Sequence, residues 1–162
     1  MFTLVSSAVL SVLFVGAHCV KTIQDCTEFQ QCISAPSKCD DIDLGNTHLS
    51  GTIPTEMGLL VYLTDLDISY NHLTGVIPTE FGSLTQLQHL QLSYNSLSGR
   101  IPMEMGLMAQ MSDLEFEGNR LTGSVPTELG LLTRLFEIDG ESNMLEGPIP
   151  TELGRLRQLT ML

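Results

Sequence analysis

The sequence predicts an α/β solenoid, in which short repeated units stack into one continuous coil. A 24-residue unit recurs five times in register, each copy has apolar residues at strand spacing, and each keeps the same glycine and proline positions. A fixed period in this range is typical of a solenoid, because one unit cannot bury its apolar face alone. The repeated positions are Leu49, Leu73, Leu97, Leu121 and Leu145; Gly51, Gly75, Gly99, Gly123 and Gly147; Pro54, Pro78, Pro102, Pro126 and Pro150; and Glu56, Glu80, Glu104, Glu128 and Glu152.

The segment 63–69 shows how each unit begins. Leu66 and Ile68 are two residues apart, so on a strand their side chains point to the same face and into the core. The residues beside them, Asp65 and Asp67, point the other way. Stacked at about 4.8 Å, such strands form a parallel sheet with a polar outer face.

An asparagine follows the strand in four of the five units. A carboxamide donates and accepts hydrogen bonds, so it can satisfy backbone groups where the chain leaves the sheet. The first unit has Thr47 at this position, and its hydroxyl can replace part of the amide. We therefore predict a structural ladder of Asn71, Asn95, Asn119 and Asn143.

The second half of each unit is predicted to turn. In the segment 73–78 a glycine permits a tight backbone conformation, and Pro78 prevents a ladder-bonded strand from continuing. The residues 79–82 suit a single 3₁₀ turn. The glutamate in this turn, Glu80, is predicted to cap its N-terminus, where a carboxylate meets free N–H groups.

These residues resemble the plant-type leucine-rich repeat, with the approximate consensus Leu-x-x-Leu-x-Leu-x-x-Asn-x-Leu-x-Gly-x-Ile-Pro-x-x-Leu-Gly-x-Leu-x-x. The resemblance covers residues 41–162, three quarters of the chain. It implies a right-handed superhelix with a parallel sheet on its concave side and short 3₁₀ or irregular turns on its convex side. Ectodomains of receptor-like kinases and polygalacturonase-inhibiting proteins are built this way, so the resemblance also implies recognition of a protein, a peptide or a glycan.

Three regions are predicted along the chain. Residues 1–17 are expected to be a signal peptide, because they carry no charge, are shorter than the ~20 residues that span a bilayer, and end in small residues. An uncleaved anchor is the alternative, since no basic residue follows Met1. Residues 18–40 form an N-terminal cap. Residues 41–162 form five repeats and the start of a sixth, which we expect to be truncated; in the fifth, Gly140 replaces a large core side chain and predicts a thin spot.

The four cysteines all precede the repeats. They contain no Cys-x-x-Cys pair, which favours disulfides over a zinc site, and four cysteines permit three pairings. The family places the last cysteine of its cap just before the first strand, where Cys39 lies. On that resemblance we expect Cys32 to pair with Cys39 and Cys19 with Cys26.

Three columns of outward-facing positions, here called the acidic strip, follow from the repeat. Ten of its fifteen positions are carboxylates, out of 19 in the chain. Like charges on neighbouring strands repel one another, so we expect crowding to raise the pKa of some of these carboxyl groups. The columns are Asp41, Asp65, His89, Asp113 and Glu137; Asp43, Asp67, Gln91, Glu115 and Asp139; and Gly45, Ser69, Ser93, Glu117 and Glu141.

The formal net charge of −12 argues against nucleic acid or an anionic membrane as the partner. A cationic protein or peptide fits the acidic strip, with Tyr70 and Tyr94 as aromatic contacts at its border. His89 is expected to bridge the two carboxylates beside it in its column. Two other readings stay open: the acids only keep the protein soluble, or they hold calcium. The predicted binding residues are Asp41, Asp43, Asp65, Asp67, His89, Gln91, Asp113, Glu115, Glu117, Glu137, Asp139 and Glu141.

No catalytic constellation is predicted. Carboxylate pairs such as Asp41 and Asp43 would lie on an open sheet, where nothing excludes water or raises one pKa selectively for acid–base chemistry. No phosphate-binding glycine loop or metalloprotease helix motif occurs. We therefore expect a secreted or cell-surface recognition protein with no metal and no cofactor. The alternatives are the N-terminal part of a transmembrane receptor-like kinase and an inhibitor of a secreted glycan hydrolase.

Overall fold

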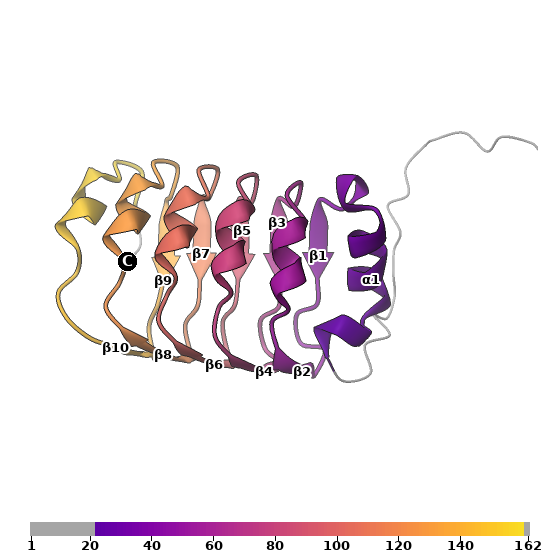
Figure 1. Ribbon diagram of the computed structural model, residues 1–162. Coiled ribbons are helices and arrows are strands. Elements are labelled where there is room, and N and C mark those ends of the chain that lie inside the picture. Colours follow the sequence, from indigo (N-terminus) through magenta and orange to yellow (C-terminus); the bar gives the residue numbers. More distant parts are fainter. Residues whose placement is uncertain (1–21, 161–162) are drawn as a thin grey trace, which may run out of the picture.

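Residues 22–160, which the computed structural model describes, wind into five stacked coils behind a helical cap (Figure 1). The strands β1, β3, β5, β7 and β9 lie on the far side in this view, and short 3₁₀ turns lie on the near side. This arrangement confirms the predicted solenoid, and it places the outward side chains of the first sheet on a face of their own.

The first sheet has five parallel strands in the order β1-β3-β5-β7-β9. Its register is the one that the 24-residue period predicts, since Asp41 pairs with Asp65 and Asp65 with His89. Ile42 and Leu66, at the centre of their strands, are buried. The strand bounds are β1 Asp41–Asp43, β3 Asp65–Asp67, β5 His89–Gln91, β7 Asp113–Glu115 and β9 Glu137–Asp139.

A second parallel sheet forms where the sequence predicts only a turn. Its order is β10-β8-β6-β4-β2. The glycine does adopt a left-handed conformation, as at Gly75 with φ +82°, but the residues before it still pair with the previous coil. Pro78 comes three residues after Gly75, so it lies beyond the strand and does not interfere with the pairing of the residues before it. The bounds are β2 Ser50–Thr52, β4 His72–Gly75, β6 Ser96–Gly99, β8 Arg120–Gly123 and β10 Met144–Leu145.

Each coil closes through a 3₁₀ turn, as predicted. The expected glutamate cap is wrong, because no turn has a side-chain cap hydrogen bond. Instead the Glu80 carboxylate accepts a hydrogen bond from the neighbouring Thr79 hydroxyl at 3.3 Å. A threonine precedes the glutamate in four of the five turns, and in each of these its hydroxyl donates to the carboxylate. The turns are η3 Thr55–Leu59, η4 Thr79–Ser83, η5 Met103–Leu107, η6 Thr127–Leu131 and η7 Thr151–Arg155.

The cap consists of η1 (Ile23–Asp25), α1 (Thr27–Ser34) and η2 (Pro36–Lys38), and it covers the first coil (Figure 1). Ile23 and Phe29 are buried in the core that continues into the repeats. The predicted disulfide between Cys32 and Cys39 is present, with an S–S distance of 2.01 Å. Cys26 is also disulfide-bonded, but its predicted partner, Cys19, lies outside the described residues, as does the predicted signal segment 1–17.

The asparagine ladder links each coil to the one before it. The Asn71 amide donates to the carbonyl of Leu44 at 2.8 Å and accepts from the backbone N–H of Leu49 at 2.8 Å. Asn95, Asn119 and Asn143 repeat the pattern at comparable distances. Thr47 replaces the bond that each asparagine makes within its own coil, because its hydroxyl donates to the Leu44 carbonyl, three residues earlier, at 2.6 Å, as Asn71 does to the Ile68 carbonyl at 3.1 Å. The ladder and the threonine substitute are both confirmed.

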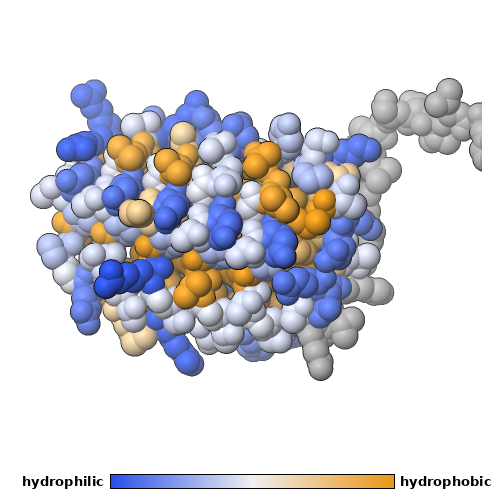
Figure 2. Space-filling view, in the orientation of Figure 1, coloured by the Kyte–Doolittle hydropathy of each residue, from blue (hydrophilic) through white to orange (hydrophobic). Residues whose placement is uncertain are grey.

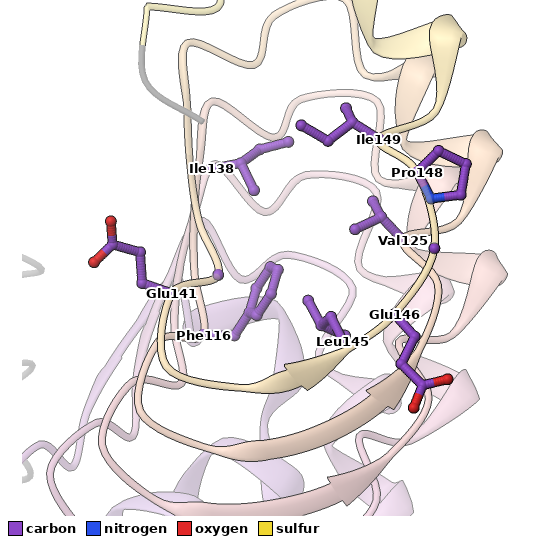
Figure 3. A pocket seen from close by; sticks show the side chains of 10 residues that line it. Phe116, Val125, Ile138, Glu141, Leu145, Glu146, Pro148 and Ile149 are labelled. Atoms are coloured by element: carbon purple, nitrogen blue, oxygen red, sulfur yellow. The ribbon is translucent and has the colours of Figure 1, made fainter.

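The predicted thin spot at Gly140 is a cavity of about 230 Å³ in the last coil (Figure 3). Phe116, Ile138 and Leu145 point into it, whereas the carboxylates of Glu141 and Glu146 point away. A Cβ at position 140 would lie 2.5 Å from the Phe116 ring, so the ring already occupies part of the space that the missing side chain leaves.

Candidate functional site

The acidic strip lies on the outer face of the first sheet, but two positions of its predicted outward-facing third column, Ser69 and Ser93, are buried. Strand pairing aligns the first column as Asp41, Asp65, His89, Asp113 and Glu137 and the second as Asp43, Asp67, Gln91, Glu115 and Asp139. The third column, Gly45, Ser69, Ser93, Glu117 and Glu141, is held in line by backbone hydrogen bonds beyond the strand ends, such as Asn46 N–H to the Ser69 carbonyl at 2.9 Å. All twelve predicted binding residues therefore lie on one surface.

A shallow hollow lies near the centre of the strip, and we call it the central hollow. Its volume is about 260 Å³. The polar atoms that line it are mostly carboxylate oxygens, so it suits a cationic group better than an apolar one. The lining residues are Asp41, Asp65, Leu66, Asp67, His89, Gln91 and Asp113.

His89 contacts only one of the two carboxylates that it was expected to bridge. Its Nδ1 lies 2.5 Å from Asp65 Oδ1. On its other side, Asp113 Oδ1 is buried and has no hydrogen-bond partner among the described residues. No hydrogen bond joins His89 to Asp113, so the bridge is incomplete and one carboxylate oxygen stays unpaired.

The two carboxyl groups beside His89 have pKa values shifted in opposite directions. Burial acts to raise the pKa of Asp65, but hydrogen bonds from Thr64 and His89 and the charge of His89 outweigh it, so this pKa falls. Burial raises the pKa of Asp113, and the charge of His89 only partly opposes that effect. His89 therefore stabilises the ionised form of Asp65 strongly and that of Asp113 only weakly.

Crowding raises other pKa values, as the sequence predicted, although burial is the larger cause. The pKa of Asp41 is raised by burial and then by the charges of Asp65, Asp43 and Asp40. The pKa of Glu115 is raised by burial and then by Asp113 and Glu137. A ligand that brings positive charge would relieve both effects, because it stabilises the ionised form.

Three of these carboxylates come close enough to touch one cation. One oxygen each of Asp113, Glu115 and Glu137 lies within 4.8 Å of the others. Calcium takes six to eight oxygen ligands, so three carboxylates on an open sheet make an incomplete site for it. The cluster is better suited to an ammonium or guanidinium group, which needs fewer partners.

Glu28 is a residue of this surface that the sequence did not predict. It lies on α1, and its pKa is raised by burial and then by the charges of Asp41 and Asp43. The cap helix thus extends the negative surface beyond the first strand. No periodic signal marks Glu28, because its position depends on how α1 packs against the first coil.

Tyr70 and Tyr94 stack on each other at the border of the strip, with ring centroids 4.5 Å apart. Both have left-handed backbone conformations, with φ of 52° and 54°. The Tyr94 hydroxyl hydrogen-bonds to Glu117, and this bond and the Glu117 charge raise the pKa of Tyr94 to about 12. The predicted aromatic border is therefore an ordered pair tied to the third column.

The opposite face carries the 3₁₀ turns, each with one glutamate in its first turn. In Figure 2 its hydrophobic side chains form small groups separated by hydrophilic ones. The exposed residues Leu59, Leu107 and Leu131 lie at the ends of η3, η5 and η6. Isolated apolar side chains of this kind are normal on a protein surface. No helix within residues 22–160 has the length and apolar character needed to cross a membrane.

Comparison with known proteins gives a consistent answer. A family model described as "Leucine rich repeat" matches residues 38–97 and 61–121. A comparison with curated protein sequences gives no match. Among solved structures, the chain is similar to the plant peptide hormone receptor RGFR1 in complex with RGF2, with 42% identity over 69% of this chain and 18% of that chain and a TM-score of 0.68.

Two structures from Arabidopsis thaliana are also similar. One is the ectodomain of the membrane receptor kinase GASSHO1/SCHENGEN3 with CASPARIAN STRIP INTEGRITY FACTOR 2, at 39% identity over 76% of this chain and 15% of that chain, with a TM-score of 0.75. The other is the ectodomain of the receptor kinase HAESA with an IDA peptide hormone, at 33% identity over 70% and 20% of the two chains, with a TM-score of 0.68. The chain thus spans a fifth or less of the length of these ectodomains.

Proposed function

This chain belongs to the leucine-rich repeat family, and we propose that it is an extracellular, non-catalytic recognition module that binds a cationic protein or peptide through the acidic strip. Residues 1–17 would act as its signal peptide and residues 18–40 as its cap. Support for the class of partner comes from the similar structures named above, each of which is a receptor with a peptide or protein factor bound.

The observation that carries the proposal is the alignment of like charges across neighbouring strands. Asp41 faces Asp65 and Asp43 faces Asp67, and Glu28 of the cap adds a further negative charge beside them. Such an arrangement costs stability, because the charges repel one another. A cationic ligand removes that cost, so its binding is favoured by the repulsion that it relieves.

The test uses fluorescein-labelled hexalysine as a probe and fluorescence anisotropy at low salt. The strip variant combines Asp65→Asn, Asp67→Asn, Asp113→Asn and Glu115→Gln. We expect it to bind hexalysine about tenfold more weakly than the wild type, since four charges close to the probe are lost.

The matched control removes the same amount of charge from the 3₁₀ turns, through Glu56→Gln, Glu80→Gln, Glu104→Gln and Glu128→Gln. These side chains lie on the opposite face, so the control should bind hexalysine within about twofold of the wild type. Equal losses in the two variants would mean that net charge attracts the probe and that the strip is no binding site.

A second candidate function is supported by the same similarity to receptor kinases. In this proposal the chain is the N-terminal, ligand-sensing part of a transmembrane receptor-like kinase. The sequence of the transcript beyond Leu162 tests it, since a membrane-spanning segment and a kinase domain are expected to follow. A stop codon directly after Leu162 would contradict it and favour the secreted module.

A further inference from the structure

Tyr70 and Tyr94 combine features that core packing does not explain. The two residues are 58% and 46% exposed, so neither belongs to the buried core. Both occupy a left-handed backbone conformation, which is uncommon for bulky residues and is borne at the same position by Asn46, Gly118 and Ser142 in the other coils. Smaller residues would fit these positions with less strain.

The rings form one ordered surface next to negative charge. The two rings stack on each other, and both tyrosines still remain exposed, so part of the stacked pair is open to a ligand. Beside Tyr94 lies Gly118, where a Cβ would come within 2.9 Å of the ring. The Tyr94 hydroxyl donates to the Glu117 carboxylate, and this bond, the Glu117 charge and the Asp139 charge all raise the pKa of that hydroxyl. An aromatic surface with carboxylates at its rim attracts a planar cation.

We propose that the Tyr70–Tyr94 pair is the specificity subsite of the acidic strip and that it takes an arginine side chain of the bound partner. This inference rests on the proposed function, because the strip supplies the general attraction for positive charge. The guanidinium group differs from a lysine ammonium in being planar and weakly hydrated, so it packs against aromatic rings while its N–H groups reach carboxylates such as Glu117. The subsite thus selects arginine over lysine.

The experiment compares fluorescein-labelled hexaarginine with hexalysine in the anisotropy assay. For the wild type we expect a Kd about five- to tenfold lower for hexaarginine. In the double variant Tyr70→Asn/Tyr94→Asn we expect this preference to fall below about twofold, with the Kd for hexalysine unchanged. Asparagine already occupies the equivalent left-handed position at Asn46, so the variant should keep its fold, which a thermal melt checks.

The matched control is Tyr62→Asn, which removes an exposed tyrosine from the turn before β3 and should keep the full preference for hexaarginine. Equal binding of the two peptides by the wild type, or an undiminished preference in the double variant, would overturn the arginine subsite while leaving the acidic strip as a binding site. If neither peptide bound the wild type, the proposed function would fail and this inference with it.

Discussion

At the scale of single residues, the ladder asparagines couple the coils most directly. Asn119 is 7% exposed, and its amide donates to the carbonyls of Leu92 and Phe116 at 3.0 and 3.1 Å while accepting from the backbone N–H of Leu97 at 2.9 Å. One side chain thus serves backbone groups of two coils. Removing it leaves several buried groups without partners.

Replacing this side chain tests the coupling. Asn119→Ala should lower the free energy of unfolding by about 3 kcal/mol. The buried backbone groups lose their hydrogen-bond partner, water does not reach them to replace it, and the missing side chain leaves a small cavity. Asn119→Thr should cost clearly less, because the Thr47 hydroxyl already replaces part of this contact in the first coil. Urea unfolding measures both variants. Equal losses for alanine and threonine would contradict this account, because they would show that a hydroxyl at position 119 replaces none of the amide's hydrogen bonds.

At the scale of single residues, the predictions from the sequence were correct at positions where the aligned residues of all five units have the same structural role. The ladder, the Thr47 substitute and the thin spot at Gly140 all follow from comparing aligned positions. The incomplete bridge at His89 could not be predicted, since it depends on the rotation of one ring between two equivalent neighbours. The alignment named both carboxylates but could not choose between them.

At the scale of elements, close packing between successive 3₁₀ turns sets the spacing of the coils. A Cβ at Gly106 would lie 2.6 Å from the Glu128 carbonyl oxygen and 2.7 Å from its Cβ. Gly58, Gly82 and Gly130 meet the next turn in the same way. The repeated glutamate therefore matters through its backbone and Cβ as well as its charge.

Gly106→Ala should lower the free energy of unfolding by about 2 kcal/mol, since the obstructing atom belongs to the backbone and cannot move aside easily. The chain offers its own control, Gly154→Ala, because a Cβ at that turn position meets no atom within 4 Å among the described residues. The control should be neutral or slightly stabilising, as glycine-to-alanine changes are where space and backbone permit. Thermal melts of the two variants measure the difference in stability. A similar loss of stability in both would mean that the turn needs glycine for its own conformation and not for packing against the next turn.

The elements themselves were only partly predictable. Strands with an apolar alternation, such as β3, and the 3₁₀ turns follow from local patterns. The second sheet does not, because its strands carry few apolar side chains and exist through pairing with the preceding coil, as when the Thr74 hydroxyl donates to the Gly51 carbonyl at 3.1 Å. The cap helix and its Glu28 likewise depend on tertiary packing that no repeat encodes.

At the scale of the whole molecule, the strip makes stability depend on pH. The folded-state pKa values of Asp41, Asp113, Glu115 and Glu28 are raised above their usual values of 3.8 for Asp and 4.5 for Glu. A group whose pKa is raised in the folded state stabilises the fold at pH values below its pKa in the unfolded chain. This contribution is lost as the pH rises through the folded-state pKa. Asp65 acts oppositely, because its pKa is lowered and its contribution is lost as pH falls.

With four groups against one, unfolding in urea at low salt should require more denaturant at pH 5 than at pH 7, and added salt should stabilise the protein more at pH 7. The variant Asp113→Asn/Glu115→Gln should narrow the difference between the two pH values, because it removes two of the groups with raised pKa values. Glu80→Gln/Glu104→Gln removes the same charge from the 3₁₀ turns and should leave the difference intact. A wild type that is more stable at pH 7 and insensitive to salt would contradict a crowded strip, since repulsion between aligned carboxylates is strongest when all of them are ionised.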